Sequence, residues 1–111
     1  MNTTTERTIL FKGKSGHEYK FWIHPLNTSF KGVPGVYAWL KETAPGTFRP
    51  LYFGQTQDLN DRHGGGHHKE DAVLRAGATH ICAHTTSGTP AQRLLEERDL
   101  IDNYNPKFND T

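Results

Sequence analysis

The apolar residues of this chain occur in short runs, each closed by glycine, proline or a polar segment. The 111 residues include eleven glycines and six prolines, and 33% are hydrophobic. Runs this short predict strands and short helices around a modest core. They also fall far below the roughly 18 apolar residues that a membrane span needs. A length of this order suits one compact domain.

The N-terminal third predicts a β-hairpin. Residues 8–13 and 17–23 flank the turn sequence Lys14-Ser15-Gly16, and in the second run Tyr19 and Phe21 alternate with polar residues. Residues 24–33, which contain proline, asparagine and glycine, are typical of a loop. We therefore expect residues 1–32 to form a hairpin extension packed on the same domain as residues 33–111.

Two further β-rich runs, residues 35–40 and 50–55, enclose the polar segment 41–49. Pro45-Gly46 within that segment indicates a hairpin with a long loop. Residues 79–86 predict another strand, with Ile81 and Ala83 on one face and Cys82 on the other.

Helices are expected between and after these strands. Capping side chains at residues 56–58 predict a short helix that the glycines at 64–66 interrupt, and residues 69–76 are helical in pattern up to Gly77. Thr89 and Pro90 predict the start of a last helix that runs to about Tyr104, before Pro106. The order predicts an α/β or α+β fold: a small antiparallel or mixed sheet flanked by helices.

Charge and cysteine content bear on the binding partners and the cellular compartment to be expected for this protein. The formal net charge is +1, with 13 basic and 12 acidic residues, so the chain lacks the basic excess of a general nucleic-acid binder. The single cysteine, Cys82, cannot form an internal disulfide, and the N-terminal residues lack an apolar stretch of the signal-peptide type. These features predict a cytoplasmic protein without a membrane partner.

An ordered set of residues carries a family resemblance. The set is Gly35-Val36-Tyr37, then Tyr52-Phe53-Gly54, then Arg62, then Glu97, then the closing segment 106–109 with the sequence PKFN. Together they resemble the GIY-YIG endonuclease family over roughly residues 33 to 109. The resemblance implies a small central antiparallel sheet flanked by helices, and cleavage of phosphodiester bonds with a divalent metal.

The resemblance also implies roles for individual residues. Tyr37 would be the general base on water, which is demanding because a tyrosine hydroxyl has a pKa near 10. Tyr52 would hydrogen-bond a phosphate oxygen or the attacking group, and Arg62 would hold phosphate oxygens. Glu97 would be the single protein ligand to Mg²⁺ or Mn²⁺, with water and substrate oxygens completing the shell. Asn109 would orient a neighbouring group or contact the substrate backbone.

Two parts of the set differ from the commonest family pattern. Tyr37 and Tyr52 are fifteen positions apart, which is wider than usual, and Gln55 follows the second glycine where many relatives carry lysine. We still expect Gln55 to contact substrate. A histidine after the arginine is also expected, and His67 and His68 are favoured over His63 as a phosphate contact or proton carrier.

The choice of Glu97 over its neighbour Glu96 rests on two arguments. The closing segment selects Glu97 by its register. On a helical wheel of about 100° per residue, Glu97 falls within an apolar arc that includes Leu94 and Ile101, and Glu96 falls outside it. A carboxylate on the packed face needs a partner, which is either a metal or an arginine.

The sequence is compatible with three functions. The first is a metal-dependent endonuclease that cuts DNA, with RNA also open as a substrate, acting alone, as a homodimer, or with an accessory protein that supplies specificity. The second is a catalytically weak or inactive nucleic-acid-binding domain of the same fold. The third is a protein-interaction module, for which Trp22 and Phe30 are the exposed aromatic candidates. A zinc site on His80, Cys82 and His84 is disfavoured, because the spacing lacks paired ligands.

Overall fold

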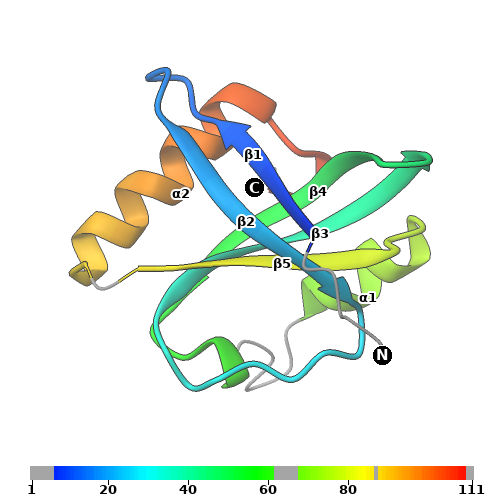
Figure 1. Ribbon diagram of the computed structural model, residues 1–111, viewed down its shortest axis with the longest axis horizontal. Coiled ribbons are helices and arrows are strands. Elements are labelled where there is room, and N and C mark those ends of the chain that lie inside the picture. Colours follow the sequence, from blue (N-terminus) through cyan, green and yellow to red (C-terminus); the bar gives the residue numbers. More distant parts are fainter. Residues whose placement is uncertain (1–6, 62–67, 87, 110–111) are drawn as a thin grey trace.

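The structure is a computed structural model that describes residues 7–61, 68–86 and 88–109. Its centre is a curled, five-stranded antiparallel sheet with the strand order β1-β2-β5-β3-β4 (Figure 1). The elements are β1 Arg7–Lys12, β2 Glu18–Pro25, β3 Gly35–Ala44, β4 Thr47–Thr56, the 3-10 turn η1 Leu59–Asp61, α1 His68–Arg75, β5 His80–Thr85, α2 Pro90–Tyr104 and the 3-10 turn η2 Lys107–Asn109.

The predicted α+β class and the predicted N-terminal hairpin are both present. β1 and β2 pair from Lys12 and Glu18 to Arg7 and Ile23, so the turn falls at residues 13–17. β2 also pairs with β5 from Trp22–Ala83 to Pro25–His80. The hairpin therefore adds two hydrogen-bonded strands to the same sheet.

The predicted long loop over residues 41–49 is wrong. β3 continues to Ala44 and β4 begins at Thr47, so only Pro45 and Gly46 connect them. Gly46 has a φ of 78°, as the third residue of a type II turn requires, and its N–H donates to Glu42 Oε2 at 2.9 Å. Residues 41–44 and 47–49, most of which are polar, extend β3 and β4 into a two-stranded arm. Their polarity alone therefore did not indicate a loop.

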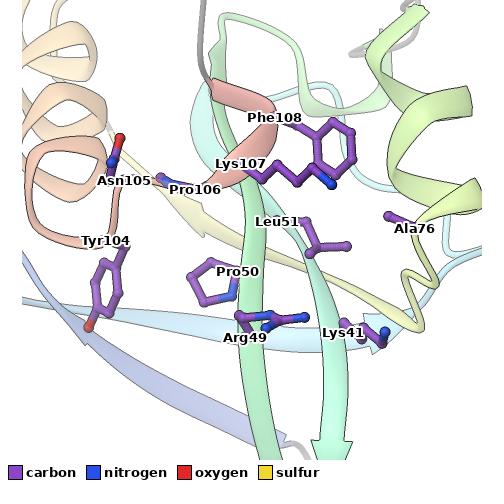
Figure 2. A pocket seen from close by; sticks show the side chains of 10 residues that line it. All are labelled: Lys41, Arg49, Pro50, Leu51, Ala76, Tyr104, Asn105, Pro106, Lys107 and Phe108. Atoms are coloured by element: carbon purple, nitrogen blue, oxygen red, sulfur yellow. The ribbon is translucent and has the colours of Figure 1, made fainter.

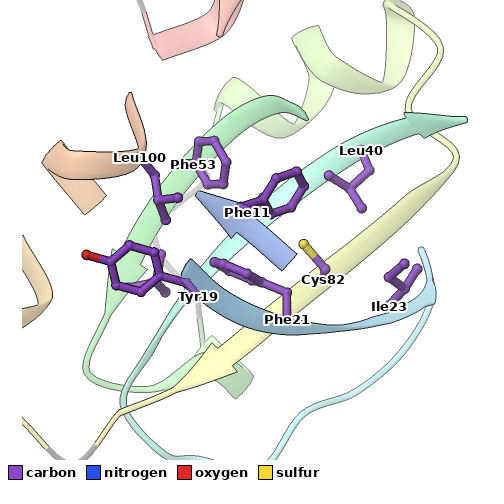
Figure 3. Packing of buried hydrophobic residues seen from close by; sticks show 10 residues of the cluster. Phe11, Tyr19, Phe21, Ile23, Leu40, Phe53, Cys82 and Leu100 are labelled. Carbon is purple, nitrogen blue, oxygen red and sulfur yellow. The ribbon is translucent and has the colours of Figure 1, made fainter. Parts of the chain in front are cut away.

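Alternate residues of the strands build two cores on opposite faces of the sheet. The first core includes Phe53, Cys82 and Leu100, and α2 covers it (Figure 3). The second core includes Tyr37, Trp39 and Val73, the last of which comes from α1. The predicted separation of Ile81 and Ala83 from Cys82 follows this division, because the first two belong to the second core.

The helix boundaries follow local chemistry. Thr89 Oγ1 accepts a hydrogen bond from the Gln92 N–H at 3.2 Å, and Pro90 occupies the first turn of α2. At the other end Asn105 adopts a left-handed conformation, with φ 46° and ψ 57°. The predicted start and end of this helix are confirmed. α1 is likewise followed by Gly77, whose φ is 99°.

Exposed apolar residues differ from the predicted ones. Trp22 and Phe30 are half-buried, and Phe30 packs against the second core. In the described ranges the large exposed apolar side chains are all leucines: Leu10, Leu74, Leu94 and Leu95. None of the helices in those ranges is both long enough and apolar enough to cross a membrane.

Candidate functional site on strands β3 and β4

The two tyrosines of the sequence motif lie on neighbouring strands of the second core. Tyr37 of β3 is paired with Gly54 of β4, and Trp39 is paired with Tyr52 two residues further along. The rings of Tyr37 and Tyr52 have centroids 6.3 Å apart. Trp39 packs against both rings, at 5.5 Å from Tyr37 and 5.7 Å from Tyr52.

Gly54 is required by the position of the Tyr37 ring. A Cβ atom at Gly54 would lie 2.5 Å from Tyr37 Cζ and 2.6 Å from Tyr37 Oη, distances that atoms in proteins do not adopt. The ring of Tyr37, which is only 3% exposed, lies across the bare backbone of β4. The glycine of the second tripeptide is therefore needed so that the tyrosine of the first can pack on it.

Tyr52 is half-buried and lies on β4, which is an edge strand of the sheet. Burial raises the pKa of its hydroxyl, and the negative charge of Glu97 raises this pKa further. Tyr52 consequently stays protonated at neutral pH. In that form it can donate a hydrogen bond to an oxygen of a bound anion.

Glu97 projects from α2 within electrostatic range of Tyr52. Burial raises the pKa of this half-buried carboxyl group, and the neighbouring Arg98 partly opposes the increase. Arg98 itself pairs with Asp102 at 3.9 Å. Within the described ranges the Glu97 carboxylate has no salt bridge or hydrogen bond, so the alternative of an arginine partner is not realised there.

Asn109 braces the backbone of β4. Its side-chain oxygen accepts from the Phe53 N–H and its side-chain nitrogen donates to the Phe53 carbonyl, both at 2.8 Å. The two bonds fasten η2 to the edge of the strand between Tyr52 and Gly54. Both polar atoms of the Asn109 side chain are therefore engaged by the backbone of Phe53.

Gln55 lies on the face of β4 that α2 covers. Its side-chain oxygen accepts a hydrogen bond from Arg93 Nε at 3.3 Å, and Arg93 Nη1 donates to the Gly88 carbonyl at 3.3 Å. Arg93 is the buried charged residue of the described chain, at 4% exposure. Sequence reasoning missed Arg93, because an arginine within a helix carries no signal that distinguishes a buried position from a solvated one.

Of four further sequence candidates, the structure places only one. Arg62, His63 and His67 lie outside the described residues. His68 is the first residue of α1. The structure brings Tyr37 and Tyr52 together on the second core, with Glu97 within electrostatic range of Tyr52 and Asn109 bound to the backbone of β4. Gln55 lies on the opposite face of β4 against Arg93. The expected phosphate contacts of Arg62 and the histidines stay predictions.

The packed face of α2 differs from the face that the helical wheel predicts. Leu94, which was expected on the packed face, is 51% exposed. Glu96, which was expected outside it, has a side chain only 12% exposed, with Oε1 lying 3.5 Å from His84 Nε2. The packed face of α2 instead includes Arg93 and Leu100. At about 100° per residue, Glu96 and Glu97 lie on either side of that face.

The fit of a divalent metal depends on Glu97. Among the described residues there is no group of three or more histidine, cysteine, aspartate or glutamate side chains that could hold a metal ion. Mg²⁺ retains several waters and can be bound through a single carboxylate. Glu97 suits this kind of binding, because it is half-buried, has no local partner in the described ranges and has a pKa raised by burial. Glu97 is the residue that would hold the ion.

Comparison of the chain with protein-family models, with curated proteins and with solved structures finds no match.

Proposed function

We propose that this protein is a metal-dependent endonuclease of the GIY-YIG type that hydrolyses phosphodiester bonds in DNA. The observation that carries the proposal is the approach of Glu97 to Tyr52, where the charge of the carboxylate raises the pKa of the tyrosine. The two residues come from different motifs of the sequence, and Tyr52 lies beside a second tyrosine that packs on the motif glycine.

The residues divide the chemistry between them. Tyr52, protonated at neutral pH, donates a hydrogen bond to a phosphate oxygen. Tyr37 takes the proton of the attacking water as general base, and Trp39 and Gly54 fix its ring. Arg62 binds phosphate oxygens with its fork of donors. Asn109 is a positioning residue that holds β4 at Phe53.

Glu97 supplies the site for Mg²⁺ or Mn²⁺. When bound, the ion stabilises negative charge that develops on the phosphate. Burial disfavours the charged form of this carboxyl group, and a cation bound beside it would offset that cost.

A cleavage assay tests the proposal. Supercoiled plasmid and branched DNA are incubated with the protein and Mg²⁺ or Mn²⁺, with a chelator as the metal-free control. Glu97→Gln should reduce cutting by about a thousandfold, as expected for lost charge stabilisation of several kcal/mol. Tyr37→Phe should reduce it by about 10²–10⁴-fold, as expected for lost general-base catalysis.

The matched control is Glu18→Gln, which removes one exposed carboxylate from β2. Equal cutting by the wild type and Glu97→Gln would show that the nuclease assignment is wrong. DNA binding without cutting, in the presence of either metal, would instead support the alternative of a catalytically inactive binding domain.

A further inference from the structure

A basic cavity lies beside the candidate site. β4, the end of α2, η2 and the end of α1 enclose a volume of about 560 Å³ (Figure 2). The cavity is lined by three basic side chains, Lys41, Arg49 and Lys107, and the described residues that line it include no carboxylate. None of these three side chains forms a salt bridge with any described residue.

Two of the basic residues are placed against each other. Lys41 of β3 and Arg49 of β4 are direct cross-strand partners, so their side chains leave the same face of the arm. Like charges in this position destabilise a sheet. The adjacent carboxylate, Glu42, does not compensate them, because it pairs with Arg7 at 3.9 Å and accepts from the Gly46 N–H. An anion in the cavity would relieve the repulsion.

The third basic residue reaches the cavity from η2. Figure 2 shows Lys107 across from Arg49 and Lys41, with Leu51 between them. Lys107 Nζ lies 5.6 Å from the centroid of the Phe108 ring. Because Asn109 fastens η2 to Phe53, this lysine is tied to the same strand as Arg49.

The cavity and the candidate site lie at different positions along the same two elements, β4 and α2. On β4, Arg49 precedes Tyr52 by three residues, or about 10 Å at strand rise. On α2, Tyr104 follows Glu97 by seven residues, which is also about 10 Å at helical rise. A nucleic-acid strand advances about 3.4 Å per nucleotide, so this distance corresponds to about three nucleotides.

We propose that Lys41, Arg49 and Lys107 bind the phosphates of the nucleic-acid strand that flanks the cut, so that the basic cavity is a second phosphate subsite of the nuclease. The inference rests on the proposed function for the position of the cut. The existence of the phosphate site itself can be tested without cleavage.

The test measures DNA binding against salt concentration. A short fluorescein-labelled DNA duplex is titrated with protein in chelator, and fluorescence anisotropy gives the binding constant at each salt concentration. Arg49→Gln with Lys107→Gln should reduce the slope of log K against log salt by about 1.8, since each phosphate contact contributes about 0.9. Lys14→Gln with Lys20→Gln removes the same charge from the N-terminal hairpin and should leave the slope unchanged.

A stability measurement separates a binding role from a structural one. Without DNA, Arg49→Gln should melt at the same or a higher temperature than the wild type, because it relieves the repulsion with Lys41. Equal loss of slope in both double variants, or no loss in either, overturns the cavity assignment. If the protein binds with the expected difference in slope but does not cut, the proposed function fails and the phosphate site stands. Normal cutting with an unchanged slope overturns the phosphate site alone.

Discussion

At the scale of single residues, Gly54 shows why a motif glycine is tied to a motif tyrosine 17 positions earlier. The strand backbone at Gly54 and the ring of Tyr37 occupy adjoining space, and a methyl group cannot be added between them. The shift that a side chain would force on Tyr37 also reaches Trp39, which packs against the same ring. The site geometry and the stability of the second core thus depend on the same contact.

We expect Gly54→Ala to lower the free energy of unfolding by about 1–3 kcal/mol, the usual cost of overpacking a core. Urea denaturation followed by tryptophan fluorescence measures the change. Gly32→Ala is the matched control, because its Cβ would meet only the flexible carboxylate of Asp58, at 3.2 Å. Similar midpoints for the wild type and Gly54→Ala would show that Tyr37 does not need this space.

Glu97 provides a prediction about pH. Its pKa is raised from 4.5 by burial, so the folded state binds a proton more tightly than the unfolded state. Stability therefore falls as the pH rises from the ordinary pKa through the raised one, and the cost persists at neutral pH. Glu97→Gln should be more stable than the wild type at pH 7, by less than about 1 kcal/mol because solvent screens a half-exposed group.

The difference between Glu97→Gln and the wild type should disappear in acid, below the ordinary carboxyl pKa, where both side chains are neutral. Urea midpoints at several pH values check this, with Glu18→Gln on the exposed face of β2 as the control. A wild type that is more stable than Glu97→Gln at pH 7, in metal-free buffer, would contradict the assignment of an unpartnered buried carboxylate.

Sequence alone selected Tyr37, Tyr52 and Glu97 as candidate site residues, because they occur in the order and pattern of a known family. It could not place Glu96, since the wheel took apolar residues as the guide to the packed face. Leu94 is exposed and Glu96 is nearly buried in the structure, which reverses that assumption. The packed face of a helix depends on the elements around it, and the pattern of apolar residues in the helix predicts that face only in part.

At the scale of elements, Asp99 is the contact that joins α2 to the N-terminal hairpin. Its carboxylate accepts from the Ser15 N–H at 2.8 Å, from Ser15 Oγ at 2.7 Å and from Tyr19 Oη at 2.8 Å. Burial tends to raise the pKa of Asp99, but these hydrogen bonds outweigh it and hold the pKa below 3.8. Burial and Asp99 together raise the pKa of the Tyr19 hydroxyl.

Asp99→Asn should lower the free energy of unfolding by about 1 kcal/mol at pH 7, because an amide accepts fewer and weaker hydrogen bonds than a carboxylate. The stabilisation is present above the ordinary carboxyl pKa and is lost as the pH falls through the lowered one. The difference between variant and wild type should therefore shrink in strong acid. Asp102→Asn, on the exposed face of the same helix, is the control. A variant midpoint that matches the wild type at pH 7 would mean that the contact is not stabilising.

The elements that sequence predicted well are those with local causes. The cap at Thr89, the stop at Gly77 and the turn at residues 13–17 follow from side chains within a few positions. The arm of β3 and β4 did not, because its polar residues are held by pairing across the strands. Long-range pairing such as this leaves no mark on the composition of the segment.

At the scale of the whole molecule, the N-terminal hairpin and the motif-bearing strands share one sheet and one core. β2 covers the edge of β5 by hydrogen bonding, and β1 and β2 contribute Phe11, Tyr19, Phe21 and Ile23 to the first core. These four side chains are at most 8% exposed. The division that sequence suggests at residue 32 therefore falls between segments that share a sheet and a core.

A chain of residues 33–111 should not fold as a monomer. Each lost core side chain contributes about 1.5–3 kcal/mol, and four together approach the 5–15 kcal/mol that stabilises a typical domain. The fragment would also expose the edge of β5, a strand whose residues 81–83 are buried in the intact chain. Far-UV circular dichroism, urea titration and size-exclusion chromatography should show a non-cooperative, self-associating species. A chain of residues 7–111 retains every described strand and should unfold cooperatively. If the shorter fragment also unfolded in one cooperative transition as a monomer, the hairpin would be an addition to a self-sufficient domain, and the shared core would not be required for folding.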